Sequence, residues 1–254
     1  MDTKFNWPKV TVIISTYDRP VMLRRALESV LMQTYEDFEV WVVDDGSDTA
    51  PAICKGIGPL FDERGVTLNC AVLERNSGYQ AAPKNYAIQM CHGAFIAYLD
   101  DDNEWDPDHL SLAMERIEET DAALVYTRWR YRGTGPGSGH DVPYTQPSDA
   151  ALAGLLQSPH LNFVDTSAIV HSKAALRYKF RGTVWDETKR RFGDWDLICR
   201  CITAQLPIRA VDRVTFTYWW HGANLQLVRP VNEETAEIQY SAGEKWDGKE
   251  ALLQ

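Results

Sequence analysis

The sequence predicts an α/β fold in which helices flank a mostly parallel sheet. The first observation is an alternation of short apolar, β-branched runs with segments whose apolar residues recur at helical spacing, a pattern typical of βαβ units. The second is that several of these runs end abruptly in polar residues, as strands do where they leave a sheet. The third is size, since 254 residues with 44% hydrophobic side chains suffice for a substantial core.

The expected elements follow in chain order. Strands are predicted over residues 10–14, 38–43, 66–73, 95–99, 122–131, 163–170 and 214–220. Helices are predicted from Pro20, because proline suits a first helical turn, and over 82–90, 107–118, 148–156 and 194–204. The glycine-rich stretch 133–139 is expected to form a surface loop rather than a lid. No repeat or linker interrupts this order, so one compact unit is expected.

Composition argues against some classes of protein. The net charge of −10 disfavours non-specific nucleic-acid binding, which needs a basic surface. No stretch approaches the roughly 18 apolar residues of a membrane span, and the N-terminus lacks a signal-peptide core, so no integral membrane association is expected. The cysteines are odd in number and form no CxxC pair, which is typical of reduced thiols in a cytoplasmic protein. They are Cys54, Cys70, Cys91, Cys199 and Cys201.

Polar residues close three of the predicted strands, at positions 17–18, 44–45 and 100–102. The carboxyl ends of parallel strands meet at one edge of a sheet, where α/β proteins bind their ligands. Consecutive carboxylates are expensive to bury unless something pairs with them. Mg²⁺ is commonly held by one or two carboxylates plus the phosphate oxygens of a substrate, so a cation site is predicted here. The alternative is a solvated acidic turn that also caps the helix near Pro107.

Six short motifs stand in the order found in a known family. They are VIISTYDRP at 12–20, SVL…QT at 29–34, VVDDGS at 42–47, NSG…N at 76–85, LDDD at 99–102 and GDWDL at 193–197. The chain resembles the inverting family 2 glycosyltransferases of the GT-A fold, most closely the spore-coat polysaccharide type. The resemblance implies one GT-A domain with a Rossmann-like nucleotide-sugar-binding half (9–105), an acceptor-binding and catalytic half (106–224) and a tail (225–254).

The resemblance implies a nucleotide site at the tips of the first two strands. Ser15 and Tyr17 would line the nucleotide base, with Tyr17 stacking on it. Asp45 would accept a hydrogen bond from the base, and because a carboxylate only accepts, it selects a base with a ring N–H such as uracil. The alternatives are that Tyr17 packs in the core and that Asp45 is a turn or helix-capping residue beside Gly46.

The resemblance also matches Asp100-x-Asp102 to the DxD signature of the family. Asp102 would coordinate Mn²⁺ or Mg²⁺, while Asp100 or Asp101 contacts the ribose, or the metal through water. A Lewis acid at the diphosphate stabilises the charge that develops as the nucleoside diphosphate departs. Arg75 and Lys84, with helix N-termini, would add to this stabilisation of the nucleotide. The alternative for both cations is a solvated surface position.

Inverting transfer needs a base that removes the proton of the acceptor hydroxyl. The family carries an acidic residue before a helix in this role, and the motif at 193–197 matches Asp194 to it. An aspartate near its usual pKa of about 3.9 is ionised at neutral pH, and general base catalysis typically contributes about 10²–10⁴-fold. The alternative is that Asp194 caps the following helix.

Further candidates lie in the second half of the chain. His221 would reach the metal or the diphosphate, because neutral imidazole is a competent ligand for Mn²⁺; the alternative is a structural histidine. Trp105, Trp195 and Trp220 would bind the acceptor, since indole faces stack on sugar rings, although large aromatic residues usually lie in the core. Asp165 is expected to border the acceptor.

The implied activity is transfer of a sugar from a nucleotide-diphosphate donor, expected to be a UDP-sugar, to a hydroxyl of a glycan or other polymer. Two other functions compete: a nucleotidyltransferase-like enzyme and a catalytically silent nucleotide-binding scaffold. The absence of GxGxxG and P-loop motifs weakens the first. The presence of both Asp102 and Asp194 argues against the second. The tail is expected to dock on the body or on a second subunit, which would allow a homodimer.

Overall fold

The computed structural model describes residues 7–133, 164–189 and 192–220. The N-terminal half includes β1 (Val10–Thr16), α1 (Pro20–Leu31), β2 (Phe38–Asp44), α2 (Ala50–Glu63), β3 (Leu68–Val72), α3 (Ala81–Met90) and β4 (Phe95–Tyr98). The C-terminal half includes β5 (Glu104–Trp105), α4 (His109–Thr120), β6 (Leu124–Gly133), the 3-10 helix η1 (Thr166–Ala168), β7 (Ile169–Ser172), α6 (Lys173–Lys179), α7 (Gly193–Thr203) and β8 (Ile208–Trp220).

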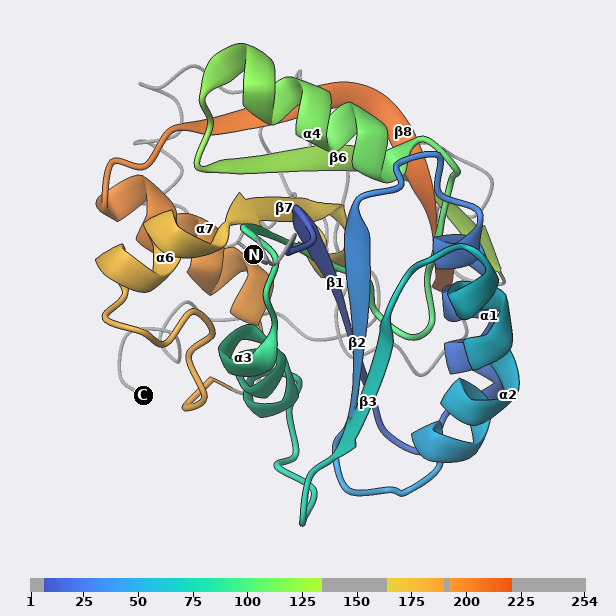
Figure 1. Ribbon diagram of the computed structural model, residues 1–254. Coiled ribbons are helices and arrows are strands. Elements are labelled where there is room, and N and C mark those ends of the chain that lie inside the picture. The colour runs from blue at the N-terminus through green and yellow to red at the C-terminus, as the bar shows by residue number, and fades with distance from the viewer. Residues whose placement is uncertain (1–6, 134–163, 190–191, 221–254) are drawn as a thin grey trace, which may run out of the picture.

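The described strands form one mixed sheet of eight strands in the order β3-β2-β1-β4-β7-β6-β8-β5 (Figure 1). Parallel pairings join β1 to β2, β1 to β4, β2 to β3 and β6 to β8, and the remaining pairings are antiparallel. The α/β class with a mostly parallel sheet is confirmed. The predicted helix 148–156, nearly all of the glycine-rich loop and the tail lie outside the described residues. None of the described helices has the length and apolar character needed to cross a membrane.

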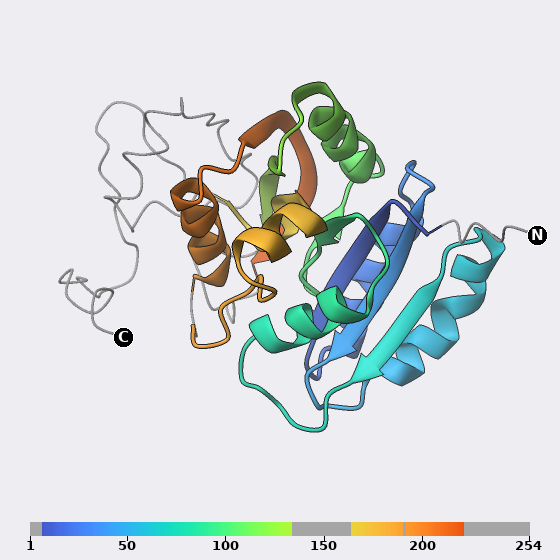
Figure 2. The ribbon, with the colours of Figure 1, turned by 60° about the vertical axis from the view of Figure 1, so that its left-hand side comes forward.

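The central strands β1 and β2 of the parallel N-terminal half are covered on both faces. All seven residues of β1 are buried, as are six of the seven residues of β2. Figures 1 and 2 show α1 and α2 on one face of these strands and α3 on the other. This burial explains why both strands are mostly apolar in the sequence, without a regular alternation of apolar and polar residues. The strand order reverses between β1 and β4, and in open α/β sheets the ligand crevice lies at the carboxyl ends of the strands at such a reversal.

The C-terminal half extends the same sheet through β7, which is antiparallel to β4. β6 is antiparallel to β7 and parallel to β8, so β6 and β8 run in the direction of β4. Helix α4 packs across both of these strands (Figure 1). The carboxyl end of β8 and the amino end of β7 therefore lie at the same edge of the sheet as the tips of β1, β2 and β4.

Helix α2 was not predicted from the apolar pattern. Pro59 stands inside it, and proline in a helix interior removes a backbone hydrogen bond. Its first turn is held instead from outside the helix, because Asp44 Oδ2 accepts the N–H groups of Thr49 and Ala50 at 2.9 and 3.0 Å. Phe61 is fully buried against the core. Tertiary contacts thus stabilise a helix that local propensity disfavours.

Candidate active site

A cleft of about 320 Å³ opens at this edge of the sheet. Its lining combines the tips of β1, β2 and β4 with residues of the C-terminal half. Eight residues predicted from the sequence line it: Ser15, Tyr17, Asp45, Asp100, Asp101, Asp102, Asp165 and Asp194. Others that line it are Thr16, Arg19, Asn76, Tyr79, Gln80, Thr166 and Tyr218. The strand tips that the sequence predicts to meet therefore share one cleft.

Tyr17 and Asp45 lie at the tips of neighbouring strands. Tyr17 is 49% exposed, so it does not pack in the core. Asp45 is buried, and its two carboxylate oxygens accept the N–H and the hydroxyl of Ser77 at 3.0 Å each. Gly46 has a φ of +89°, and a Cβ there would lie 2.7 Å from the carbonyl carbon of Arg75. Glycine thus allows the loop that carries Ser77 to approach and fix Asp45 at the cleft wall.

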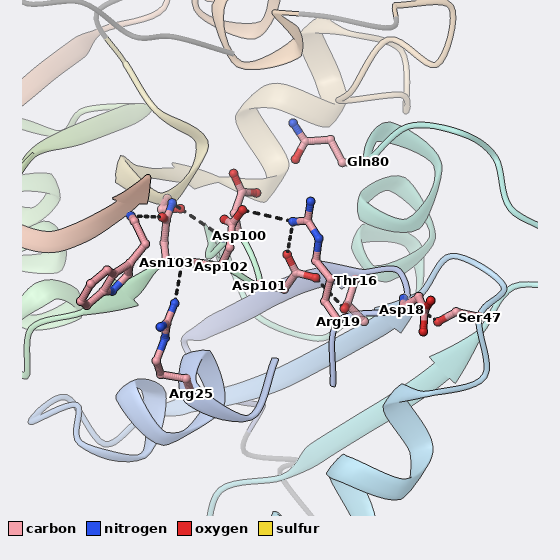
Figure 3. Close-up of polar contacts among 12 residues, drawn as sticks. Thr16, Asp18, Arg19, Arg25, Ser47, Gln80, Asp100, Asp101, Asp102 and Asn103 are labelled. Atoms are coloured by element: carbon pink, nitrogen blue, oxygen red, sulfur yellow. Dashed lines mark hydrogen bonds and ion pairs between the residues drawn. The ribbon is translucent and has the colours of Figure 1, made fainter. Parts of the chain in front are cut away.

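The acidic turn after β4 closes around one guanidinium group (Figure 3). Arg19 Nη1 lies 3.1 Å from Oδ1 of Asp101 and 3.1 Å from Oδ2 of Asp102. The Thr16 hydroxyl donates to the other oxygen of Asp101 at 2.6 Å. Burial, together with the neighbouring Asp102, raises the pKa of Asp101 to about 6. The carboxylates of Asp101 and Asp102 lie so close together that a positive charge between them is needed to offset their repulsion.

These carboxylates fit a divalent cation whose shell is completed by a ligand. Oxygens of Asp101 and Asp102 already converge on one cationic nitrogen. Among the described residues there is no group of three or more His, Cys, Asp or Glu side chains that would hold a metal unaided. Mn²⁺ or Mg²⁺ would therefore take Asp102, with Asp101 beside it, and complete its shell with water and phosphate oxygens. His221, the other predicted ligand, lies outside the described residues.

Lys84 lies behind the acidic turn and not along the cleft. Its side chain is fully buried, with Nζ 3.2 Å from Oδ1 of Asp100 and a hydrogen bond to Gln80. Nζ also lies 4.5 Å from the centroid of the Trp185 ring, a cation–π contact. Neither the predicted nucleotide contact nor the alternative of a solvated surface position describes this buried lysine. Arg75 is exposed and does not line the cleft, so its contact with the nucleotide stays a prediction.

Asp194 comes from the first turn of α7 and is buried. Its Oδ1 accepts the N–H of Trp195 at 2.7 Å. The cap residue of α7 is Phe192, so the alternative of Asp194 as N-cap does not hold. Gly193 donates its N–H to the Tyr79 hydroxyl at 2.9 Å, which fixes the start of the helix at the cleft. The positive end of the helix dipole favours an ionised carboxylate in this turn.

Asp165 reaches the cleft from the residues before η1. It is 4% exposed, and its Oδ1 accepts the N–H of Ser167 at 2.8 Å. Burial, together with Asp100 and Asp194, raises its pKa well above the ordinary value. Because β7 runs antiparallel to β4, the amino end of β7 meets this edge of the sheet. Asp165, which was expected to border the acceptor, thus lines the cleft, and its contact with the acceptor stays a prediction.

Arg19, Tyr79 and Tyr218 are lining residues that were not predicted. Arg19 could have been predicted to line the cleft, since it closely follows the tip of β1 and lies in the motif at 12–20. Tyr218 lies within β8, and which of its residues face the cleft depends on the register with β6. Tyr79 depends on the contact with Gly193, which is far away in the sequence. Only the first of these could have been found from the sequence.

The three tryptophans predicted to bind the acceptor do not line the cleft. Trp105 is 4% exposed, its Nε1 donates to the Ser167 carbonyl at 2.8 Å, and its ring stacks on His109 at 4.1 Å between centroids. Trp195 is also buried, and Trp220 is half-buried against the core. Trp105 and Trp195 pack as large aromatic residues usually do, against the expectation that their faces are open to a sugar, whereas the acceptor contact of half-buried Trp220 stays a prediction.

This sheet, with an acidic cleft at its strand-order reversal, defines an α/β protein of the GT-A fold. The family model described as Glycosyl transferase family 2 matches residues 11–180, so the chain belongs to that family. An uncharacterized glycosyltransferase of Nostoc sp. is 32% identical over 239 residues, which cover 91% of this chain and 71% of that protein. WcaA of Escherichia coli, named for colanic acid biosynthesis, is 27% identical over 199 residues, covering 78% and 67%. Protein CgeD of Bacillus subtilis is 27% identical over 221 residues, covering 82% of this chain but only 50% of that longer protein.

Solved structures share the fold. S. aureus TarS 1-349 in complex with UDP-GlcNAc has a TM-score of 0.66 at 20% identity, covering 85% of this chain and 60% of that one. Mannosyltransferase PcManGT from Pyrobaculum calidifontis, in complex with GDP-Man and Mn²⁺, has a TM-score of 0.60 at 16% identity, covering 91% and 59%. At these identities the likeness shows the fold alone. The predicted family and the GT-A fold are thus both confirmed.

Proposed function

We propose that this chain is a metal-dependent inverting glycosyltransferase that moves a sugar from a UDP-sugar to a hydroxyl of a glycan or other polymer. The observation that carries the proposal is that Asp45, Asp102 and Asp194, from three separate elements, line one cleft. Membership of family 2 supports the transfer of a sugar. The UDP-GlcNAc bound to TarS and the GDP-Man and Mn²⁺ bound to PcManGT support a nucleotide-sugar donor and a divalent ion.

The donor would bind along the tips of the parallel strands. The exposed ring of Tyr17 is free to stack on the base beside Ser15. Each carboxylate oxygen of Asp45 accepts one hydrogen bond from Ser77 and has further accepting capacity for the N–H of a uracil ring. Asp100 or Asp101 would contact the ribose. These roles follow the order of the residues along the cleft edge, from β2 through β1 to β4.

Transfer requires charge stabilisation at the diphosphate and a base at the acceptor. A divalent ion at Asp102 supplies Lewis-acid stabilisation of the leaving diphosphate when bound. Arg19, already at 3.1 Å from this carboxylate, adds positive charge beside it. Asp194 accepts the proton of the acceptor hydroxyl as that oxygen attacks the anomeric carbon and the bond to the diphosphate breaks. One new glycosidic bond and one nucleoside diphosphate result.

A thermal-shift screen followed by a donor assay tests this proposal. UDP with Mn²⁺ should raise the melting temperature, since a ligand that binds only the folded state stabilises it. A panel of UDP-sugars should then show slow release of UDP from one or more donors. Stabilisation by nucleoside triphosphates alone would favour a nucleotidyltransferase. No response to either nucleotide would favour a silent scaffold and contradict the proposal.

The acceptor is proposed to be a glycan or another hydroxyl-bearing polymer. Its hydroxyl must reach the Asp194 carboxylate, so the acceptor has to enter the cleft beside the start of α7. A cytoplasmic location and a homodimer remain predictions. Sedimentation of the full chain at several concentrations would test the second of these.

A further inference from the structure

Two of the cysteines, Cys54 and Cys70, face each other where α2 packs on β3. Asn69 Nδ2 lies 3.5 Å from Oε2 of Glu39, whose other oxygen accepts N–H groups just after α3, so Asn69 points to the α3 face of the sheet. Successive side chains of a strand point to opposite faces, so Cys70 points to the face that α1 and α2 cover (Figure 1). Cys54 is one of four buried residues at helical spacing along α2, so it lies on the side of the helix that packs against this face.

The two thiols are hydrogen-bonded to each other but differ in their surroundings. Cys54 is 7% exposed, whereas Cys70 is exposed on β3, the last strand at one end of the described sheet. The hydrogen bond from Cys54 lowers the pKa of Cys70, and the same bond, together with burial, raises the pKa of Cys54. Because the thiolate is the reactive form, Cys70 is the accessible nucleophile and Cys54 is a shielded thiol beside it.

The remaining three cysteines lack this combination. All three lie in the described part of the chain, where Cys91 and Cys201 are buried and Cys199 is half-buried. Burial raises the pKa of each, to about 11 for Cys199 and about 12 for Cys201. An exposed cysteine of lowered pKa with a second cysteine in contact is the arrangement typical of redox-sensitive thiols.

We propose that Cys54 and Cys70 are a redox-active pair that reacts with small disulfides and closes to a disulfide linking α2 to β3. The Cys70 thiolate attacks one sulfur of a disulfide such as oxidised glutathione, so that a mixed disulfide forms and one glutathione thiolate leaves. Cys54 then loses its proton to water and attacks the Cys70 sulfur, which releases the second glutathione. Two protein thiols are thereby oxidised while one small disulfide is reduced to two thiols.

Peptide mapping of the full chain tests the pairing. The folded protein is incubated with oxidised glutathione, and the remaining thiols are then alkylated with N-ethylmaleimide in denaturant. Trypsin cuts after Lys55 and Arg64, which separates Cys54 and Cys70 onto different peptides. Mass spectrometry should show these two peptides joined by a disulfide, while the other three cysteines carry the alkyl group. Absence of this link, or earlier oxidation of another cysteine, would overturn the proposal.

Two variants separate the roles of the pair. Cys54→Ser keeps a hydroxyl that can donate to Cys70 but cannot resolve the mixed disulfide, so glutathione should stay on Cys70. Cys70→Ser should lower the rate of glutathione addition at Cys54 by at least roughly tenfold, because the shielded thiol loses its exposed partner. Cys199→Ser, the matched control outside the pair, should form the Cys54–Cys70 link at the wild-type rate.

The contrary results are equally definite. No adduct on Cys70 in Cys54→Ser, or an unchanged rate at Cys54 in Cys70→Ser, would overturn the assigned roles. The peptide map of the wild type decides the pairing whether or not Cys54→Ser folds.

Discussion

Glu39, near the amino ends of the parallel strands, and the cleft carboxylates Asp101 and Asp165 have opposite properties. Glu39, in β2 near the amino end of the sheet, is 4% exposed and accepts hydrogen bonds from the Thr11 hydroxyl and from the N–H groups of His92 and Gly93. Burial alone would raise its pKa, but these donors outweigh burial and lower it. At the carboxyl end, burial and like-charged neighbours raise the pKa values of Asp101 and Asp165.

The difference teaches that burial does not by itself decide what a carboxylate does. All of these carboxylates lose water, yet the protein supplies enough hydrogen-bond donors to Glu39, and also to Asp44 at the tip of β2, but not to Asp101 and Asp165. The cleft carboxylates instead face one another, an arrangement that a cation or a hydroxyl-rich ligand can complete. We therefore expect substitutions at the two ends to separate cleanly, with loss of stability at one and loss of binding or transfer at the other.

The largest expected effect is on transfer. Asp194→Asn should lower the turnover number by about 10²–10⁴-fold, because the amide cannot accept the acceptor proton. UDP–Mn²⁺ affinity and the melting temperature should stay close to wild type. Steady-state kinetics with the donor found in the UDP-sugar panel, with calorimetry of UDP alongside, would measure both. Activity close to wild type would show that another group is the base.

The next largest effect is on stability, at the buried ion pair of Lys84 with Asp100 behind the acidic turn. Lys84→Met should lower the free energy of unfolding by about 3 kcal/mol, because it leaves the Asp100 carboxylate without its buried partner. Urea denaturation measures the loss. Lys55→Met, on the exposed face of α2, is the matched control and should stay within about 0.5 kcal/mol of wild type. Adding Asp100→Asn to Lys84→Met should recover part of the loss, and no recovery would contradict the pairing.

Glu39→Gln should be a pure stability variant. Five donors lose a charged acceptor, and the expected cost is about 1.5–3 kcal/mol, with unchanged UDP binding. Because the folded-state pKa is lowered, this stabilisation is present above the ordinary glutamate pKa and is lost as pH falls through the lowered value. Urea denaturation from neutral to acid pH should show the two proteins converging in acid. A difference in unfolding free energy that does not change with pH would mean that the charge of Glu39 does not stabilise the protein.

The smallest expected effect on stability is at Asp101. Because its folded-state pKa is about 6, ionisation as pH rises from the ordinary value to about 6 destabilises the ligand-free protein. Asp101→Asn removes this penalty, so its stability relative to wild type should rise modestly over that pH range. Conversely, UDP–Mn²⁺ affinity of the wild type should weaken as pH falls through about 6, since the protonated carboxyl no longer attracts the cation. Affinity independent of pH would argue that Asp101 stays ionised.

The parallel strands β1 and β2 could be predicted from the sequence because burial on both faces makes them mostly apolar. The meeting of the acidic residues that follow these strands could also be predicted, since the carboxyl ends of neighbouring parallel strands lie at one edge of the sheet. What could not be predicted depends on distant contacts. Helix α2 needs Asp44 to hold its first turn, and Lys84 faces inward only because α3 packs against the core.

Calorimetric titration of UDP into the wild-type chain and Asp102→Asn, each in Mn²⁺ and in a metal chelator, tests the proposed site most directly. The wild type should bind UDP at least roughly tenfold more tightly in Mn²⁺ than in chelator, and the variant should bind equally in both. Equal wild-type affinity in the two buffers, or a full Mn²⁺ effect in Asp102→Asn, would contradict a divalent cation held by the acidic turn after β4.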